Sequence, residues 1–324
     1  MKVLLIGPVF FSYTKAIALE LNRRGITCFA YNELHSKSIL SKIFYRLGLD
    51  FLFKKGVLSH RLKIYDFIDS HKITDVLFVS PEIISTEYLM AIKHKAKVHL
   101  YMWDGMKNKS RVLPLLDLFA TKSSFDMADC KEYKMRYIPL FAEKEYSGFS
   151  SEKEYDLCFC GTVHSNRPLW IKRFQGYANN NHLRIGLFLY YYSPLLLLIR
   201  LLVNRCCFVL FSKVAYTSFS KESIAELFRS SRAVIDIAHS NQNGLTARTF
   251  EALRSGAKLI TNNENCRTLG DEYQSRIFII DNINNQRKEL LTFIKSDVAP
   301  LNKEQEYFLS IERFTDQVLE SLND

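Results

Sequence analysis

The sequence predicts an α/β protein made of two Rossmann-like domains, and three observations support this fold class. Residues 3–31 have the pattern strand, turn, helix and strand, with which a Rossmann-like domain begins. Strand and helix patterns alternate again over residues 156–295, which predicts a second parallel sheet. Residues 143–154 lie between these patterns, are polar and charged and contain Ser-Gly, so we expect a linker there. The predicted domains therefore cover residues 1–145 and 150–300.

The chain opens with a buried strand over residues 3–6, followed by a Gly-Pro turn. We expect a helix over about residues 12–24, with Gly25 at its end, and a second strand over residues 26–31. The loop before the helix lacks the Gly-x-Gly-x-x-Gly pattern that binds dinucleotides. Neither NAD nor FAD is therefore expected here.

A basic and aromatic segment over residues 37–55 has two interpretations. It is either a solvated amphipathic helix with aromatic core residues or a surface that faces a substrate or a membrane. The rest of this half alternates between strand and helix patterns. We expect helices over residues 59–71 and 125–134, and strands over residues 75–79, 98–102, 118–121 and 136–140.

Two carboxylates come shortly after strands of this half. Glu82 follows the strand over residues 75–79, and Asp104 follows the strand over residues 98–102. Open α/β sheets bind ligands beyond the carboxyl ends of their strands, so both residues are candidates for catalysis in a cleft. The alternative is that each residue caps a helix or forms a turn.

The second half begins with a strand over residues 157–160, which leads into Gly161, Thr162, His164 and Arg167. A glycine directly after a strand lets a ligand approach the backbone, and the polar groups that follow suit a phosphate or a sugar. An ordinary strand-to-helix loop is the alternative. We expect later strands over residues 183–190, near Val214, and over residues 233–238, 259–261 and 277–280, with helices starting near Pro168 and over residues 195–203, 220–230, 283–295 and 302–322.

The central pattern is the strand, polar loop, helix and strand over residues 233–261. The loop contains Gly244, and Gly256 ends the helix that follows. A helix N-terminus offers free N–H groups and a positive dipole end to an anion. Arg248 lies in the first turn of this helix, where the dipole disfavours a cation. We therefore expect an anionic partner at this place.

The composition is that of a basic globular protein. The chain is 48% hydrophobic and 24% charged, with a formal net charge of +10. This charge favours an acidic partner such as nucleotide phosphates or an anionic membrane surface. Nucleic acid is not expected, because no block of lysine and arginine is dense enough to indicate it.

The apolar stretch over residues 187–211 is interrupted by Pro194, Arg200 and Arg205, so we do not expect a membrane span. A strand and a helix with a large apolar face are expected instead. Contact of this face with an anionic membrane is a second interpretation. No signal peptide is recognised, and seven scattered cysteines indicate a reducing compartment, so we expect a cytoplasmic location, with the inner face of the plasma membrane as the place of any membrane contact. Cys158 and Cys160 fit buried thiols better than zinc ligands.

Several segments of the sequence resemble parts of a known enzyme family. Residues 248–256 and 258–260 resemble the nucleotide-sugar motif of GT-B glycosyltransferases, most closely the CgeB-like, or spore-maturation-protein-like, group, which includes bacterial polysaccharide and lipopolysaccharide biosynthesis enzymes. Residues 231–237 match the strand before that motif. Residues 159–162 with Arg167 resemble the start of that group's C-terminal domain, and residues 137–140 the end of its N-terminal domain.

The resemblance implies a GT-B fold, with two Rossmann-like domains facing a central cleft. The N-terminal domain would bind a glycan or lipid-linked glycan acceptor, and residues 301–324 would form a helix packing back onto it. The C-terminal domain would bind a nucleotide sugar, with Glu251 on the ribose, Arg248 and neighbouring N–H groups on the diphosphate and Tyr216 near the base. The donor-binding residues implied are Gly161, Thr162, Arg167, Tyr216, Thr217, Asn243, Gly244, Thr246, Arg248, Thr249 and Glu251.

The stereochemistry and the catalytic base stay open at this point. Many retaining members carry a glutamate eight positions before the ribose-binding one, where this chain has Asn243. The candidates for the base of an inverting reaction are Asp104, Glu82 and His164. No Asp-x-Asp sequence occurs, so no bound metal or other cofactor is expected. A sugar-nucleotide epimerase and a non-enzymatic nucleotide-binding protein are the alternatives.

Overall fold

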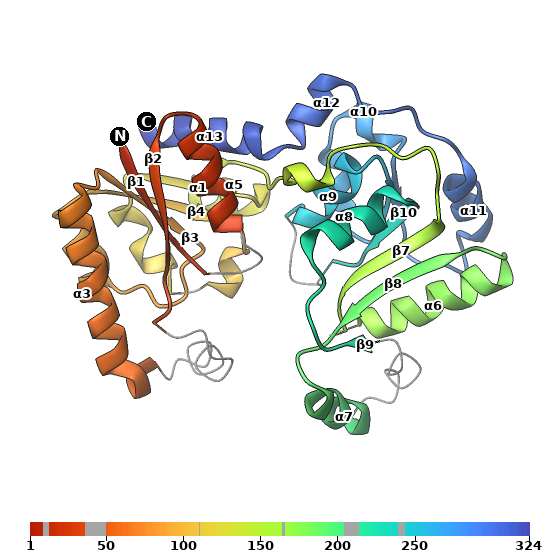
Figure 1. The fold of residues 1–324 in the computed structure, drawn as a ribbon, viewed down its shortest axis with the longest axis horizontal. Helices are drawn as coiled ribbons and strands as arrows, with labels where there is room; N and C mark the ends of the chain where they lie inside the picture. The colour runs from red at the N-terminus through yellow and green to blue at the C-terminus, as the bar shows by residue number, and fades with distance from the viewer. Residues whose placement is uncertain (9–12, 36–49, 110, 164–165, 204–213, 239–243) are drawn as a thin grey trace. The chain divides into compact units, whose positions relative to one another are not determined.

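The computed structural model describes residues 1–8, 13–35, 50–109, 111–163, 166–203, 214–238 and 244–324. The chain forms two compact units (Figure 1). Unit 1 comprises Met1–Leu140 and Ile311–Asp324, and unit 2 comprises Phe141–Ser310. Most of the basic segment predicted over residues 37–55 lies outside the described residues.

Unit 1 is built on a parallel sheet with the order β2-β1-β3-β4-β5-β6 among the described residues. Its central strands are mostly apolar, because helices cover both faces of such a sheet, although they also bury Asp75 and His99, whose side chains lie 3.2 Å apart. The chain leaves β1 toward one edge and returns at β3 to build toward the other, so the order reverses between β1 and β3. The strands are β1 (Lys2–Gly7), β2 (Thr27–Asn32), β3 (Asp75–Val79), β4 (Lys97–Met102), β5 (Thr121–Ser124) and β6 (Arg136–Tyr137), and the helices are α1 (Tyr13–Arg23), α3 (Lys54–His71), α4 (Thr86–Lys93) and α5 (Met127–Tyr133).

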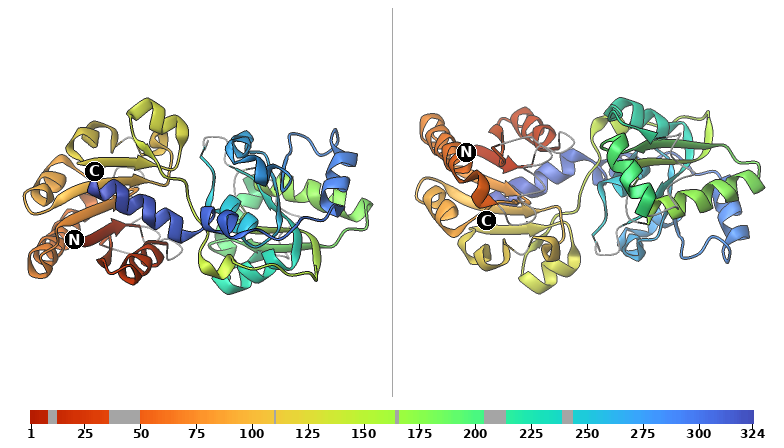
Figure 2. Two further views of the ribbon diagram at one scale, coloured as in Figure 1. Left: turned by 90° about the horizontal axis from the view of Figure 1, so that it is seen from above. Right: turned by 90° about the horizontal axis from the view of Figure 1, so that it is seen from below.

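The C-terminal helix α13 (Ile311–Asn323) also belongs to unit 1. Arg313 donates hydrogen bonds to the carbonyl oxygens of Pro139 at 2.9 Å and Leu140 at 2.6 Å. The Ser321 hydroxyl lies 3.1 Å from that of Ser123 in β5. Both chain termini therefore lie on unit 1 (Figure 2).

The single helix predicted over residues 302–322 is wrong, because the structure has two helices there. The first, α12 (Lys303–Phe308), belongs to unit 2 and is capped by Asn302. The Leu309 carbonyl oxygen accepts the N–H of Ala142 at 2.8 Å, and the chain leaves the helix at this point. Tyr307 of α12 is 47% exposed.

Unit 2 has a parallel sheet with the order β12-β11-β10-β7-β8-β9 in the part of the chain that is described. Its order reverses between β7 and β10, which are neighbours. The strands are β7 (Tyr155–Thr162), β8 (Ile185–Tyr190), β9 (Val214–Ala215), β10 (Ser231–Asp236), β11 (Lys258–Thr261) and β12 (Ile277–Ile279), and the longer helices are α6 (Arg167–Asn180), α7 (Pro194–Val203), α8 (Lys221–Arg229), α9 (Ala247–Arg254) and α11 (Arg287–Lys295).

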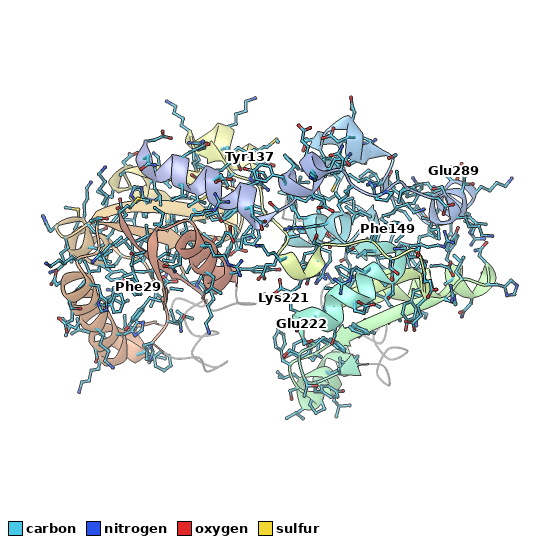
Figure 3. All side chains as sticks on the ribbon, turned by 45° about the horizontal axis from the view of Figure 1, so that its top comes forward. Phe29, Tyr137, Phe149, Lys221, Glu222 and Glu289 are labelled. Atoms are coloured by element: carbon cyan, nitrogen blue, oxygen red, sulfur yellow. The ribbon has the colours of Figure 1, made fainter. Side chains whose placement is uncertain are left out.

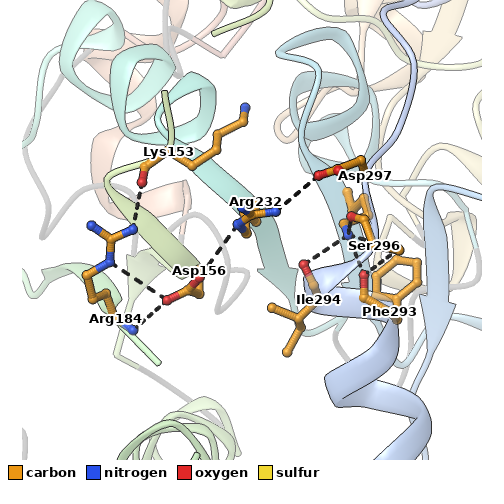
Figure 4. A network of polar contacts seen from close by, with 9 residues as sticks. Lys153, Asp156, Arg184, Arg232, Phe293, Ile294, Ser296 and Asp297 are labelled. Atoms are coloured by element: carbon orange, nitrogen blue, oxygen red, sulfur yellow. Dashed lines mark hydrogen bonds and ion pairs between the residues drawn. The ribbon is translucent and has the colours of Figure 1, made fainter. Parts of the chain in front are cut away.

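Charged residues hold the amino ends of the unit 2 strands together (Figure 4). Asp156 of β7 lies 3.8 Å from Arg184 and 3.7 Å from Arg232 of β10, and Arg232 lies 3.3 Å from Asp297. The buried Lys258 ammonium donates hydrogen bonds to the last carbonyl groups of α11, and burial lowers its pKa to about 8. These residues stabilise the edge opposite to the carboxyl ends of the strands.

Two local predictions differ from the structure. Residues 118–121 were expected to form a strand, but Leu118 ends a short 3₁₀ helix (Leu113–Leu118) and the strand is β5. Pro114 is the second residue of that helix, and its fixed φ angle suits a first turn. In the expected linker over residues 143–154, Glu143 and Tyr146 are buried within unit 2.

Candidate functional site

The carboxyl ends of β7 and β10 lie side by side in unit 2, where the strand order reverses. Gly161 and Thr162 end β7, and Asp236 ends β10. Parallel α/β sheets form their ligand-binding crevice at such a reversal. Gly161 and Thr162 therefore lie within the strand end and not in the loop predicted for them.

Arg167 is the first residue of α6, and its side chain lies at the carboxyl ends of β7 and β10. Its Nε donates a hydrogen bond to the carbonyl oxygen of Ile237 at 3.3 Å. A Cβ atom placed on Gly161 would lie 3.3 Å from the Phe159 ring and 3.7 Å from Arg167 Nη1, so a side chain at this position would crowd the ring and touch the guanidinium. Burial lowers the pKa of Arg167, and Asp236 opposes this by its negative charge. A cation thus lies between the ends of the two central strands.

The N-terminus of α9 is fastened to the same edge. The Thr246 hydroxyl donates a hydrogen bond to Asp236 Oδ2 at 2.7 Å, and its oxygen accepts the N–H of Thr249 at 3.4 Å. The carbonyl oxygen of the buried Gly244 accepts a hydrogen bond from Asn263 at 3.1 Å. The start of α9 is therefore held beside β10, as an anion site at a helix N-terminus requires.

Arg248 and Glu251 form an ion pair on α9, with 3.4 Å between Nη1 and Oε2. The Arg248 guanidinium carbon lies 4.9 Å from the ring centroid of Phe228 in α8. Burial lowers the pKa of Arg248. The negative charge of Glu251 and a weaker interaction with Cys160 raise it by more, so the pKa lies above its ordinary value. The structure thus brings together two residues for which separate donor contacts were predicted, and those contacts stay predictions.

A second ion pair lies close to this one. Lys221 of α8 (Figure 3) pairs with the buried Glu143. Burial raises the pKa of Glu143, Lys221 lowers it, and Glu251 is one of the negative charges that raise it again. Sequence reasoning missed Glu143 because it was expected in an exposed linker.

The other predicted donor residues lie farther along the sheet or outside the description. Tyr216 and Thr217 follow β9, the outermost strand; Tyr216 packs against the core and Thr217 is exposed. His164 and Asn243 lie outside the described residues. The described site at the strand reversal therefore consists of Gly161, Thr162, Arg167, Asp236, Gly244, Thr246 and Thr249, with Arg248 and Glu251 beside it. Asp236 was not predicted, because it lies within the otherwise apolar run over residues 233–238.

In unit 1, Lys109 connects the two candidate carboxylates. Its ammonium lies 3.4 Å from Glu82 Oε1 and 3.6 Å from Asp104 Oδ2. Ser80, in the left-handed region at φ 41°, accepts the N–H groups of Trp103 and Asp104 with its hydroxyl at 2.8 and 3.2 Å. The Glu82 side chain is 13% exposed and that of Asp104 is 45% exposed. Asp104 is therefore the more accessible of the two.

Glu33 holds the backbone beside this cluster in place. It directly follows β2, is buried, and its carboxylate accepts the N–H groups of Glu82 and Ile83 at 2.8 to 2.9 Å. Burial raises the pKa of Glu33 to about 7, against the lowering effect of those N–H groups and of Lys109. An acidic residue directly after a strand was the signal that could have indicated Glu33.

No group of three or more His, Cys, Asp or Glu side chains suited to a metal ion occurs among the described residues. The thiols of Cys158 and Cys160 are buried, and burial raises the pKa of Cys158 to about 12. None of the helices in the described part of the chain is long and apolar enough to cross a membrane.

Comparison with known proteins places the fold. No family model and no curated protein matches the sequence. Among solved structures, HepE (Alr3699) of Anabaena in complex with UDP-glucose is 10% identical, covers 100% of this chain and 99% of its own, and has a TM-score of 0.64. A glycosyltransferase from Rickettsia africae is 12% identical over 98% of this chain and 97% of its own, with a TM-score of 0.61. The UDP-GlcNAc 2-epimerase of Methanocaldococcus jannaschii is 12% identical over 100% of this chain and 99% of its own, with a TM-score of 0.55.

These similarities extend over the whole chain and show that the fold is GT-B, as the resemblance implied. At 10 to 12% identity they establish the fold alone. The more specific CgeB-like relationship stays a prediction.

Proposed function

We propose that this chain is a glycosyltransferase that moves a hexosyl or pentosyl group from a nucleotide-activated donor to a glycan or lipid-linked glycan acceptor in bacterial surface polysaccharide synthesis. The observation that carries the proposal is Arg167 at the strand reversal of unit 2, beside the anchored N-terminus of α9. This arrangement suits a diphosphate, and the GT-B fold is shared with HepE, whose structure contains UDP-glucose. A lipid-linked acceptor would place the reaction at the inner face of the plasma membrane.

In this proposal unit 2 binds the donor. Arg167 and the N–H groups in the first turn of α9 bind the diphosphate, for which Gly161 leaves space. Glu251 accepts hydrogen bonds from the ribose hydroxyls, and its pairing with Arg248 holds the carboxylate ready for them. Tyr216 and Thr217 contact the base.

Unit 1 binds the acceptor, whose hydroxyl oxygen attacks the anomeric carbon of the donor sugar. The bond from that carbon to the phosphate oxygen breaks, and the nucleoside diphosphate leaves with the electron pair. Arg167 and the α9 dipole stabilise its added charge, without a metal ion in this scheme. The acceptor proton passes to Asp104, which is more exposed than Glu82, while Lys109 orients the carboxylate.

A thermal-shift screen with UDP, GDP, CDP, CMP and TDP tests the donor half of the proposal. A ligand at a hundred times its dissociation constant adds about 2.7 kcal/mol to the free energy of unfolding. One responding nucleotide identifies the donor class, and its sugar conjugates are then assayed for transfer to glycan acceptors. The absence of any response to these nucleotides would contradict the proposal.

The similarity to the archaeal epimerase supports a second candidate function, a sugar-nucleotide epimerase. Incubation with the nucleotide sugar alone separates the two, because an epimerase converts the sugar without an acceptor and a transferase requires one. A chain that binds nucleotide but shows neither reaction would be a non-enzymatic nucleotide-binding protein.

A further inference from the structure

Several exposed apolar side chains gather on one helix of unit 2. Leu195, Leu196 and Leu198 of α7 are 64%, 46% and 49% exposed, and the nearby Tyr192 is 51% exposed. Leu197 is 1% exposed and packs into the core of the unit. With 3.6 residues per turn, the three exposed leucines span an arc of roughly 160° opposite Leu197. One side of α7 thus anchors the helix and the other presents leucines.

The position and length of α7 limit what it can do. It lies next to β9, the edge strand of the unit 2 sheet (Figure 1). Its ten residues give a length of about 15 Å, against a hydrocarbon core of about 30 Å. A helix of this length can lie along a bilayer surface but cannot cross it.

The charge of the surrounding sequence indicates what covers the leucines. No aspartate or glutamate occurs between Asp156 and Glu222, whereas eight lysines and arginines do. Three of the eight are engaged elsewhere, since Arg184 pairs with Asp156, Lys221 pairs with Glu143 and Arg167 lies at the strand reversal, so five remain. Such a stretch is attracted to anionic headgroups. Pairing of two copies through α7 would instead bring two positively charged stretches together, which disfavours a second copy as the partner.

We propose that α7 docks unit 2 on the surface of an anionic phospholipid bilayer, with Leu195, Leu196 and Leu198 entering the boundary between headgroups and acyl chains. Hydrophobic burial of the leucines holds the helix, and the basic residues select an anionic surface. The docking needs neither donor nor acceptor, so a test of membrane binding does not depend on the proposed transfer reaction.

The test is co-sedimentation of the full chain with vesicles of phosphatidylcholine alone or mixed with phosphatidylglycerol. The variant Leu195→Gln/Leu198→Gln removes the leucine face but keeps residues that favour a helix. The control Leu19→Gln/Met127→Gln changes two exposed apolar residues of unit 1. We expect the α7 variant to bind the anionic vesicles at least about tenfold more weakly than the wild type and the control. High salt should also weaken binding by the wild type.

Three results would overturn the proposal. They are no binding of the wild type to anionic vesicles, unchanged binding by the α7 variant, and a concentration-dependent dimer that the variant loses in light scattering. Equal wild-type binding to both vesicle types would overturn its anionic part. Melting by circular dichroism checks that each variant is folded, and the single change Leu195→Gln provides the same comparison if the double variant does not fold.

Discussion

The Thr246 hydroxyl donates a 2.7 Å hydrogen bond to Asp236, and its oxygen also accepts the Thr249 N–H at the start of α9. One side chain therefore joins the end of β10 to the cap of α9. The N–H groups offered to an anion keep their position because Thr246 is held from both sides.

Thr246→Val should cost more than the roughly 1 kcal/mol of unfolding free energy that a lost helix cap costs, because it also removes the hydrogen bond to the buried Asp236, and it should weaken nucleotide binding. Ser220→Ala is the matched control, because Ser220 caps α8 and accepts the Ser223 N–H at 3.1 Å. In urea denaturation Ser220→Ala should lose about 1 kcal/mol, and Thr246→Val should lose more. Equal nucleotide affinity in the two variants would contradict a role for the α9 terminus in the site.

The sequence was sufficient to predict the fold class, since alternating strands and helices and buried apolar runs are local features. It also identified Gly256, which follows α9 and whose φ is 71°. The break between α12 and α13 could not be predicted, because helical periodicity continues across it. It coincides with a hydrogen bond from Ala142, more than 160 residues earlier in the chain.

The candidate site was predicted less completely than the fold. Glycine, hydroxyl and basic residues after a strand indicated Gly161, Thr162 and Arg167. The stacking of Arg248 on Phe228 depends on how α8 packs against α9, which no spacing within α9 reveals. Glu33 was missed because its partner Glu82 lies about 50 residues away in the sequence. Lys109 was missed because Glu82 and Asp104 were considered one at a time, without a cation that contacts both.

Arg167→Gln should weaken binding of the responding nucleoside diphosphate at least about tenfold, because a charge-assisted contact to phosphate is lost. Affinity for the corresponding nucleoside should change little. Arg173→Gln, on the same helix and beside Trp170, is the control for a loss of charge. Isothermal titration of diphosphate and nucleoside measures both effects, and an equal loss for the two ligands would argue against a phosphate contact.

The Arg248–Glu251 pair can be measured by a double-mutant cycle with Arg248→Met and Glu251→Gln. Removing one partner of a buried pair costs about 3–5 kcal/mol, and we expect about 2 kcal/mol because Arg248 is partly exposed. The double variant should lose less than the sum of the single variants. Strictly additive losses in urea denaturation would show that the two charges are not coupled.

Asp104→Asn should lower kcat by about a hundredfold or more if Asp104 accepts the acceptor proton, since general base catalysis contributes about 10²–10⁴. Its affinity for the nucleotide should stay unchanged, because unit 2 binds the donor in this proposal. Glu82→Gln is the comparison, as Glu82 contacts the same Lys109 but is less exposed. A larger kcat loss for Glu82→Gln would assign the base to Glu82.

Glu33 should make the stability of unit 1 depend on pH. Burial raises its pKa from the ordinary 4.5 to about 7, so the folded state binds more protons than the unfolded state between these values. The free energy of unfolding should therefore fall as pH rises from about 4.5 to about 7, by up to about 3 kcal/mol. Glu33→Gln keeps an acceptor for the N–H groups of Glu82 and Ile83 but cannot ionise, so its decline should be smaller. Urea titrations in a Trp170→Phe background report on unit 1, since Trp103 is then the remaining tryptophan of the two. The control Glu132→Gln changes an exposed carboxylate of the same unit and should keep the pH dependence of the parent. If the unfolding free energy of Glu33→Gln declined with pH as steeply as that of the parent, Glu33 would not be the group responsible.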